Sequence, residues 1–182
     1  MDECFQVSCR EIQRKLEEHG NVMWNELREI IQEMLVRTVD MQKRGCKGKI
    51  AYFVCSFLQS SVYIRKLMLR IETLDEGFYL DEQEAGEHYF LWLLQDNYQE
   101  DLEFLHQKVY EEFIRVQNYE LEEVNVAYTE YYDALICKVI QSLSCLIMRT
   151  VSESGTCLSD GFQIVYGEYM GSVAVIHVSD AV

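Results

Sequence analysis

The sequence predicts an α+β fold, predominantly helical, with a small antiparallel sheet. Its 182 residues include no proline, where average usage predicts about nine; this absence favours long helices joined by short connections. Apolar residues recur at helical spacing over most of the chain. Two short segments, 67–81 and 162–178, instead alternate or are rich in β-branched residues. We therefore expect helices around a sheet built from a central and a C-terminal hairpin.

The length is typical of one domain, so we expect residues 1–182 to form a single domain. Four regions are expected within it: a helical hairpin over 1–44, an apolar helix and β-hairpin over 50–81, an acidic helical arm over 82–150, and a β-hairpin over 162–178.

The first 44 residues carry two apolar stripes. The first stripe has spacings of four, three and four residues and consists of Phe5, Cys9, Ile12 and Leu16. It predicts a helix that ends near Gly20, since glycine is the usual residue just after a helix. A second stripe runs from Trp24 to Met41, so the sequence predicts two helices packed antiparallel.

A basic loop follows at residues 45–49. Its spacing does not match a phosphate-binding loop, because only two residues separate Gly45 from Gly48 and Ile50 follows Lys49. A solvated turn is the main interpretation. The alternative is an anion contact made by Lys43, Arg44, Lys47 and Lys49.

The densest apolar run, 50–64, is consistent with a buried helix or a buried strand. Its length and the spacing of Phe53, Phe57, Ser61 and Ile64 favour a helix. A strand is expected from Leu67, because apolar residues alternate there. The Asp75-Glu76-Gly77 sequence is typical of a tight turn, which makes residues 78–81 the expected partner strand.

Residues 82–95 read as a short helix, and no glycine or proline occurs from 87 to 154. Two offset apolar stripes cover 98–116 and 121–146. They fit either two helices that meet near 118–125 or one bent helix. The C-terminal hairpin needs a sheet to lie against, so we expect Leu69 and Ile71 to share a sheet with Val173 or Val175.

The formal charge is −15, and all of it lies in residues 50–182, which hold seven basic and 22 acidic residues. A field of this sign repels phosphates and anionic membrane surfaces, so we expect no direct nucleic-acid or membrane binding. No segment has about 18 uninterrupted apolar residues. Seven cysteines, without a CxxC pair, indicate reduced thiols and a cytoplasmic protein.

Aromatic residues are interleaved with carboxylates between 96 and 133, where 11 acidic and two basic residues give a net charge of −9. Aromatic residues are enriched in interfaces, and charge of one sign steers association. The predicted interaction surface consists of Tyr98, Tyr110, Glu111, Glu112, Tyr119, Glu122 and Glu123. The leading interpretation is a non-enzymatic interaction or regulatory protein that binds a basic protein partner and self-associates through its helices.

Two alternatives remain open. Glu84 and His88 are four residues apart, and Glu103 and His106 three apart, which puts each pair on one side of a helix. These four residues are the candidate ligands of a metal-dependent enzyme; apart from this divalent metal, no cofactor is predicted. The second alternative is an acidic phosphate mimic that inhibits a nucleic-acid-binding protein.

Overall fold

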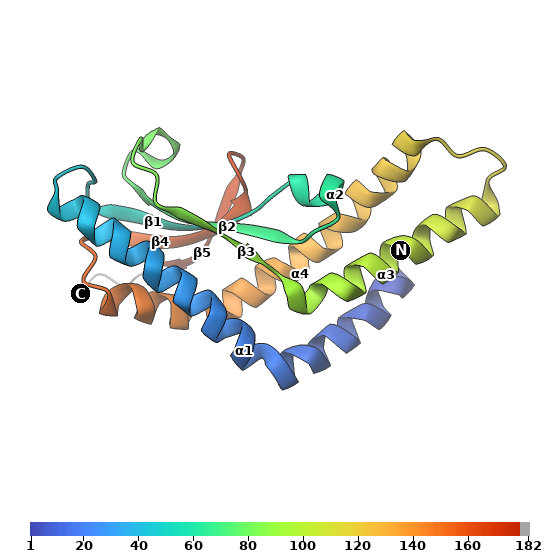
Figure 1. Cartoon of the computed structure of the whole chain (residues 1–182), viewed down its shortest axis with the longest axis horizontal. Coiled ribbons are helices and arrows are strands. Elements are labelled where there is room, and N and C mark those ends of the chain that lie inside the picture. Colours follow the sequence, from blue (N-terminus) through green and yellow to red (C-terminus); the bar gives the residue numbers. More distant parts are fainter. Residues whose placement is uncertain (179–182) are drawn as a thin grey trace.

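The computed structural model describes residues 1–178 and shows a helix-dominated α+β fold with a five-stranded sheet (Figure 1). The helical elements are α1 Asp2–Lys43, α2 Ser60–Ile64, η1 Phe78–Leu80, α3 Trp92–Glu112 and α4 Asn118–Glu153. The strands are β1 Ile50–Phe57, β2 Met68–Asp75, β3 Gly86–Phe90, β4 Leu158–Glu168 and β5 Val173–Val178. The predicted fold class is confirmed.

The strand order is β3-β2-β1-β4-β5. Neighbours pair antiparallel except β1 and β4, which run parallel, so the sheet is mixed and not antiparallel as predicted. Cys55 in β1 is opposite both Ile71 of β2 and Tyr166 of β4. The central strands therefore do share a sheet with the C-terminal hairpin, but β1 lies between β2 and β4.

The helix predicted over 50–64 is wrong, because residues 50–57 form the central strand. β1 is hydrogen-bonded on both sides, and all of its residues except Tyr52 are buried. A strand buried on both faces is apolar throughout and does not alternate. The helical prediction was correct only for the short α2, which follows β1.

The helical hairpin predicted over 1–44 is also wrong, since α1 is one helix of 42 residues. It passes through Gly20 and Asn21 without a break and bends in its N-terminal half (Figure 1). Gly20 is the only glycine of α1; glycine weakens a helix without necessarily ending it. The apolar stripe continues through this point with Ile12, Met23 and Leu27, all buried.

Two predictions downstream of β2 need correction. The tight turn at 75–77 is present, and the Gly77 N–H donates to Asp75 Oδ1 at 2.8 Å. Residues 78–80 then form a 3-10 turn instead of a strand, and the partner of β2 is β3. β3 occupies part of the helix predicted over 82–95, and α3 begins only at Trp92.

The arm consists of two helices, α3 and α4, which answers the question left open by the two stripes. Residues 113–117 connect them, and the Gln117 N–H donates to Glu120 Oε2 at 2.7 Å, which fixes the start of α4. Within residues 1–178, α4 is the one helix long and apolar enough to cross a membrane by length and composition. It buries one stripe of residues, from Leu121 to Val151, against the rest of the fold, and 33% of its apolar 18-residue stretch is buried.

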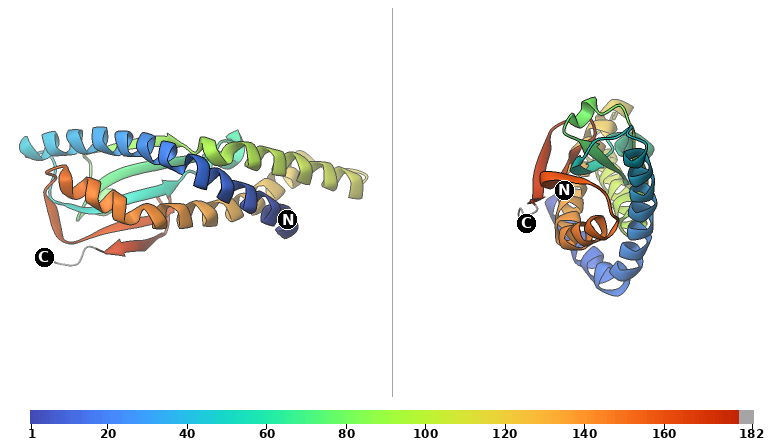
Figure 2. Two further views of the ribbon diagram at one scale, coloured as in Figure 1. Left: turned by 90° about the horizontal axis from the view of Figure 1, so that it is seen from below. Right: turned by 90° about the vertical axis from the view of Figure 1, so that its left-hand side faces the viewer.

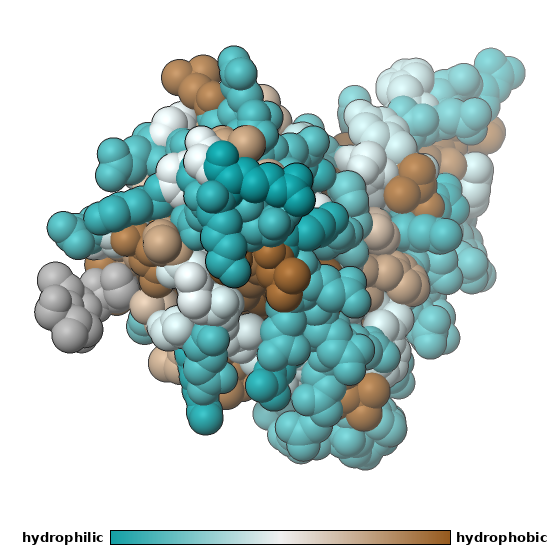
Figure 3. All heavy atoms as spheres, turned by 60° about the vertical axis from the view of Figure 1, so that its left-hand side comes forward, coloured by the Kyte–Doolittle hydropathy of each residue, from teal (hydrophilic) through white to brown (hydrophobic). Residues whose placement is uncertain are grey.

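The main core lies between the helices and one face of the sheet, as the views in Figure 2 show. Phe53, Ile71 and Ile164 point into it from adjacent strands and are essentially inaccessible. The opposite face carries a smaller apolar cluster of Val54, Leu74 and Val165, covered in part by Phe78 and Tyr79. The face shown in Figure 3 is mostly hydrophilic, with apolar residues in small separate groups.

Candidate functional site: an acidic groove along α4

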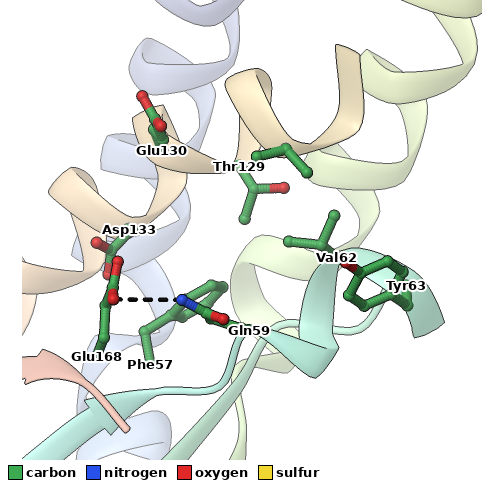
Figure 4. Close-up of a pocket in the computed structure, with 9 residues that line it drawn as sticks. Phe57, Gln59, Val62, Tyr63, Thr129, Glu130, Asp133 and Glu168 are labelled. Carbon is green, nitrogen blue, oxygen red and sulfur yellow. Dashed lines mark hydrogen bonds between the residues drawn. The ribbon is translucent and has the colours of Figure 1, made fainter. Parts of the chain in front are cut away.

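A cavity of about 210 Å³ lies where α2, the first half of α4 and the end of β4 meet (Figure 4). Its lining consists of Phe57, Gln59, Val62, Tyr63, Val126, Thr129, Glu130, Asp133 and Glu168. Val62 and Tyr63 lie toward one side, whereas Asp133 and Glu168 lie close together on the other. The cavity therefore has an apolar side and an acidic side.

A second, more open hollow continues from this cavity along α4. The two share Tyr63, Val126 and Glu130, and the second adds Tyr119, Glu122, Glu123 and Ala127. We call the combined surface, from Tyr119 to Glu168, the acidic groove. Tyr63 and Tyr119 are 72% and 61% exposed, so the groove presents two aromatic rings that are largely uncovered by the described chain.

The carboxylates of the groove are not neutralised from within the described chain. Among residues 1–178, Glu122, Glu123 and Glu130 make no ion pair or side-chain hydrogen bond. Glu168 accepts a hydrogen bond from Gln59 Nε2 at 3.2 Å, and Asp133 accepts one from the Tyr166 hydroxyl at 2.5 Å. Both of these donors are neutral, so the groove keeps its negative charge.

Asp133 is affected by this charge. Burial raises the pKa of its carboxyl above the usual range, and the nearby Glu168 and Glu130 raise it further, while the Tyr166 hydrogen bond opposes both effects. Burial and the adjacent Asp133 in turn raise the pKa of the Tyr166 hydroxyl. A cation placed beside Asp133 relieves the repulsion among the three carboxylates.

The sequence-predicted interaction surface divides into three parts. Tyr119, Glu122 and Glu123 line the acidic groove. Tyr110, Glu111 and Glu112 are exposed at the end of α3, where Glu111 pairs with Lys108 at 2.7 Å. Tyr98 is fully buried, and its hydroxyl lies 2.7 Å from Thr129 Oγ1, so its assignment to the surface is wrong.

The four candidate metal ligands are not brought together. Glu84 pairs with Arg70, His88 lies on β3, Glu103 is exposed on α3, and His106 Nε2 lies 2.6 Å from Asn125 Oδ1. Throughout residues 1–178 no group of three or more His, Cys, Asp and Glu residues is arranged to hold a metal ion. The helix that would have paired Glu84 with His88 is absent, because a loop and β3 replace it.

The four basic residues predicted for an anion contact are also not brought together as one site. Lys47 is buried, with Nζ 2.5 Å from both Asp81 Oδ2 and the Gln83 carbonyl oxygen, so it anchors the chain after η1. Arg44 pairs with Asp40 at 2.6 Å. Lys43 and Lys49 are exposed, which leaves two of the four residues predicted for an anion contact without a protein partner in the described chain.

Sequence reasoning missed the cavity, because its residues come from three segments far apart in the chain. It also missed a buried cluster around Asp101, whose carboxylate accepts hydrogen bonds from Ser8 at 2.7 Å, Tyr128 at 2.6 Å and Tyr132 at 2.8 Å. The only signal for this cluster was an acidic residue beside Leu102 within an apolar stripe. It joins α1 to both helices of the arm, and none of its four residues lines the groove.

Comparison with models of protein families, with curated proteins and with solved structures gives no match. A proposal about function therefore rests on the chemistry of the groove alone. Carboxylates on one side, an apolar floor and exposed tyrosines suit a ligand that is cationic at one end and apolar beside it.

Proposed function

We propose that this is a non-enzymatic interaction protein whose acidic groove docks a cationic, partly apolar segment of a protein partner. The observation that carries the proposal is the cavity in which Glu130, Asp133 and Glu168 lie opposite Val62 and Tyr63 without any cation facing them in residues 1–178. Carboxylates held this closely repel one another until a positive group arrives.

The size of the cavity favours a side chain as its occupant. Sites for drug-sized ligands and cofactors usually span roughly 300–1,000 Å³, whereas the cavity itself is about 210 Å³ and only the more open hollow beside it, about 420 Å³, extends the groove into that range. One long basic side chain fits such a space, with its methylene stem along Phe57 and Val62 and its charge beside Asp133. The open hollow toward Tyr119 then receives the residues that flank it.

Arginine fits better than lysine. Its planar guanidinium donates in a fork that matches fixed carboxylates, and it stacks on aromatic rings. Tyr166 and Gln59 hold the carboxylates of Asp133 and Glu168 by hydrogen bonds, and Tyr63 presents an exposed ring nearby. The partner is therefore expected to present an arginine next to apolar residues.

Fluorescence anisotropy tests this function with labelled peptides that place one arginine, lysine or norleucine between two leucines. We expect binding in the order arginine, lysine, norleucine, weakening as salt is raised. Replacing Glu130 and Glu168 by Gln should weaken arginine-peptide binding at least tenfold. The matched control, Glu111→Gln with Glu112→Gln, removes the same charge at the end of α3, outside the groove lining.

An equal loss of affinity in both double variants would show attraction to overall negative charge and no defined site. Equal binding of the arginine and norleucine peptides would likewise refute the role of the carboxylates.

A further inference from the structure

The connection between α3 and α4 exposes apolar side chains at the end of the arm. Phe113 is 59% exposed and Ile114 is completely exposed, followed by the exposed Arg115 and the half-buried Val116. We call residues 113–116 the arm tip. Figure 1 shows it projecting beyond the sheet, at the end farthest from the C-terminal half of α1. Adjacent exposed apolar residues of this kind commonly mark contact surfaces.

Arg115 gives the arm tip a positive charge. Residues 96–133 carry only Lys108 and Arg115 as basic residues. Lys108 pairs with Glu111 and lies over the ring of Phe104. Within the described residues Arg115 makes no ion pair or side-chain hydrogen bond. The arm tip thus presents what the acidic groove lacks, a guanidinium beside exposed apolar groups.

We propose that two copies of this chain form a dimer in which the arm tip of each copy docks in the acidic groove of the other. This inference rests on the proposed function and names its partner. Ile114 covers Val62 and Val126, and the Arg115 guanidinium lies among Glu130, Asp133 and Glu168. The exchange brings opposite charges together at two equivalent places and covers both exposed tips.

The spacing along α4 agrees with such an exchange. Asp133 lies 15 residues beyond Asn118, the first residue of α4, which corresponds to about 22 Å at the rise of an α-helix. Two arms packed side by side in opposite directions, overlapping by this length, bring each tip to the other groove. The contact is the same from both sides, so it closes as a twofold dimer instead of extending into a fibre.

Sedimentation velocity over a hundredfold concentration range tests the exchange with two single charge reversals, Arg115→Glu and Glu130→Lys. Both residues are exposed and make no contact that the described fold depends on. Wild type is expected to form a dimer, and each variant to dissociate at least tenfold more readily. An equimolar mixture of the two variants should associate again. The unchanged tip of one variant meets the unchanged groove of the other, and at the second contact the reversed charge at position 130 offsets part of the repulsion between the reversed tip and the two remaining carboxylates, Asp133 and Glu168.

Arg28→Glu on α1 is the matched control, since it makes the same reversal at an exposed residue that belongs neither to the arm tip nor to the lining of the acidic groove; it should dimerise as wild type does. A wild type that stays monomeric over the whole range overturns the exchange. So does a mixture that stays as dissociated as its two components.

These failures are distinguishable from failure of the groove itself. The labelled arginine peptide should bind the Arg115→Glu variant, in which the groove is intact. Peptide binding together with a monomeric wild type contradicts the exchange alone, whereas loss of peptide binding by the monomeric variant contradicts the proposed function on which the exchange rests.

Discussion

Asp101 illustrates how a single residue organises the interior of this protein. Its side chain is buried, and it accepts hydrogen bonds from Ser8 on α1 and from Tyr128 and Tyr132 on α4. A buried carboxylate is tolerated when donors replace its lost water. Burial and the hydrogen bond to Asp101 raise the pKa of the Tyr128 hydroxyl, so the tyrosine remains a donor at any physiological pH.

Replacing Asp101 by Ala should lower the free energy of unfolding by about 3 kcal/mol, because three buried hydroxyls lose their acceptor. Urea denaturation measures this change. Asp96→Ala, at an exposed position of the same helix, should alter stability by less than about 0.5 kcal/mol. Equal effects of the two substitutions would mean that the cluster does not stabilise the fold.

Asp133 contributes a pH dependence whose sign follows from its environment. Its pKa is raised by burial and by the neighbouring carboxylates. Between about 4, the ordinary value for Asp, and the raised value, the folded protein binds more protons than the unfolded chain. The free energy of unfolding therefore falls as pH rises through this window.

An Asp133→Asn variant should lack this fall, since its amide oxygen still accepts from Tyr166 but carries no charge. Urea midpoints measured from pH 4 upward should therefore diverge, with the variant gaining stability relative to wild type as pH increases. Parallel curves for the two proteins would contradict a raised pKa at this position.

At the scale of elements, sequence patterns predict strands correctly where apolar and polar residues alternate or where β-branched residues lie between turns. β2 is predicted in this way although both of its faces are buried, because one face carries the paired Arg70 and Glu72; the C-terminal hairpin is predicted as well. β1 is not, because it lies at the centre of the sheet between β2 and β4 and is almost entirely apolar on both faces, so that no alternation is visible. The offset of the apolar stripes is consistent with two helices or one bent helix in the arm. The structure has two helices, connected by residues 113–117.

Gly20 is the position at which the prediction and the structure differ: the sequence predicts a helix that ends there, whereas α1 continues through it. A Cβ at this position meets no atom within 4 Å, so Gly20→Ala should raise the free energy of unfolding by about 0.5–1 kcal/mol. Gly155 also has open space, but its φ of +76° is strained for alanine, and Gly155→Ala should destabilise by about 1 kcal/mol. Destabilisation by both substitutions would indicate that the chain reverses at Gly20.

At the scale of the whole molecule, composition predicts the α+β class and the acidic arm, but not the groove. The arm residues Tyr119, Glu122 and Glu123 are identifiable from sequence, because charge and aromatic residues are visible there. Tyr63 and Glu168 come from α2 and β4, which tertiary packing alone brings beside α4. Tyr98 is misassigned because an aromatic residue in an amphipathic helix fits the core and the surface equally well.

The central claim is that the acidic groove, and not the acidic surface in general, binds a cationic segment. Methyl NMR locates binding most directly, because Val62 and Val126 line the groove whereas Val36 is exposed on α1, away from it. On titration with the arginine peptide, we predict shifts of the Val62 and Val126 methyl signals that saturate together, with Val36 unchanged. Saturable peptide binding that leaves the methyl signals of Val62 and Val126 unshifted would contradict the claim.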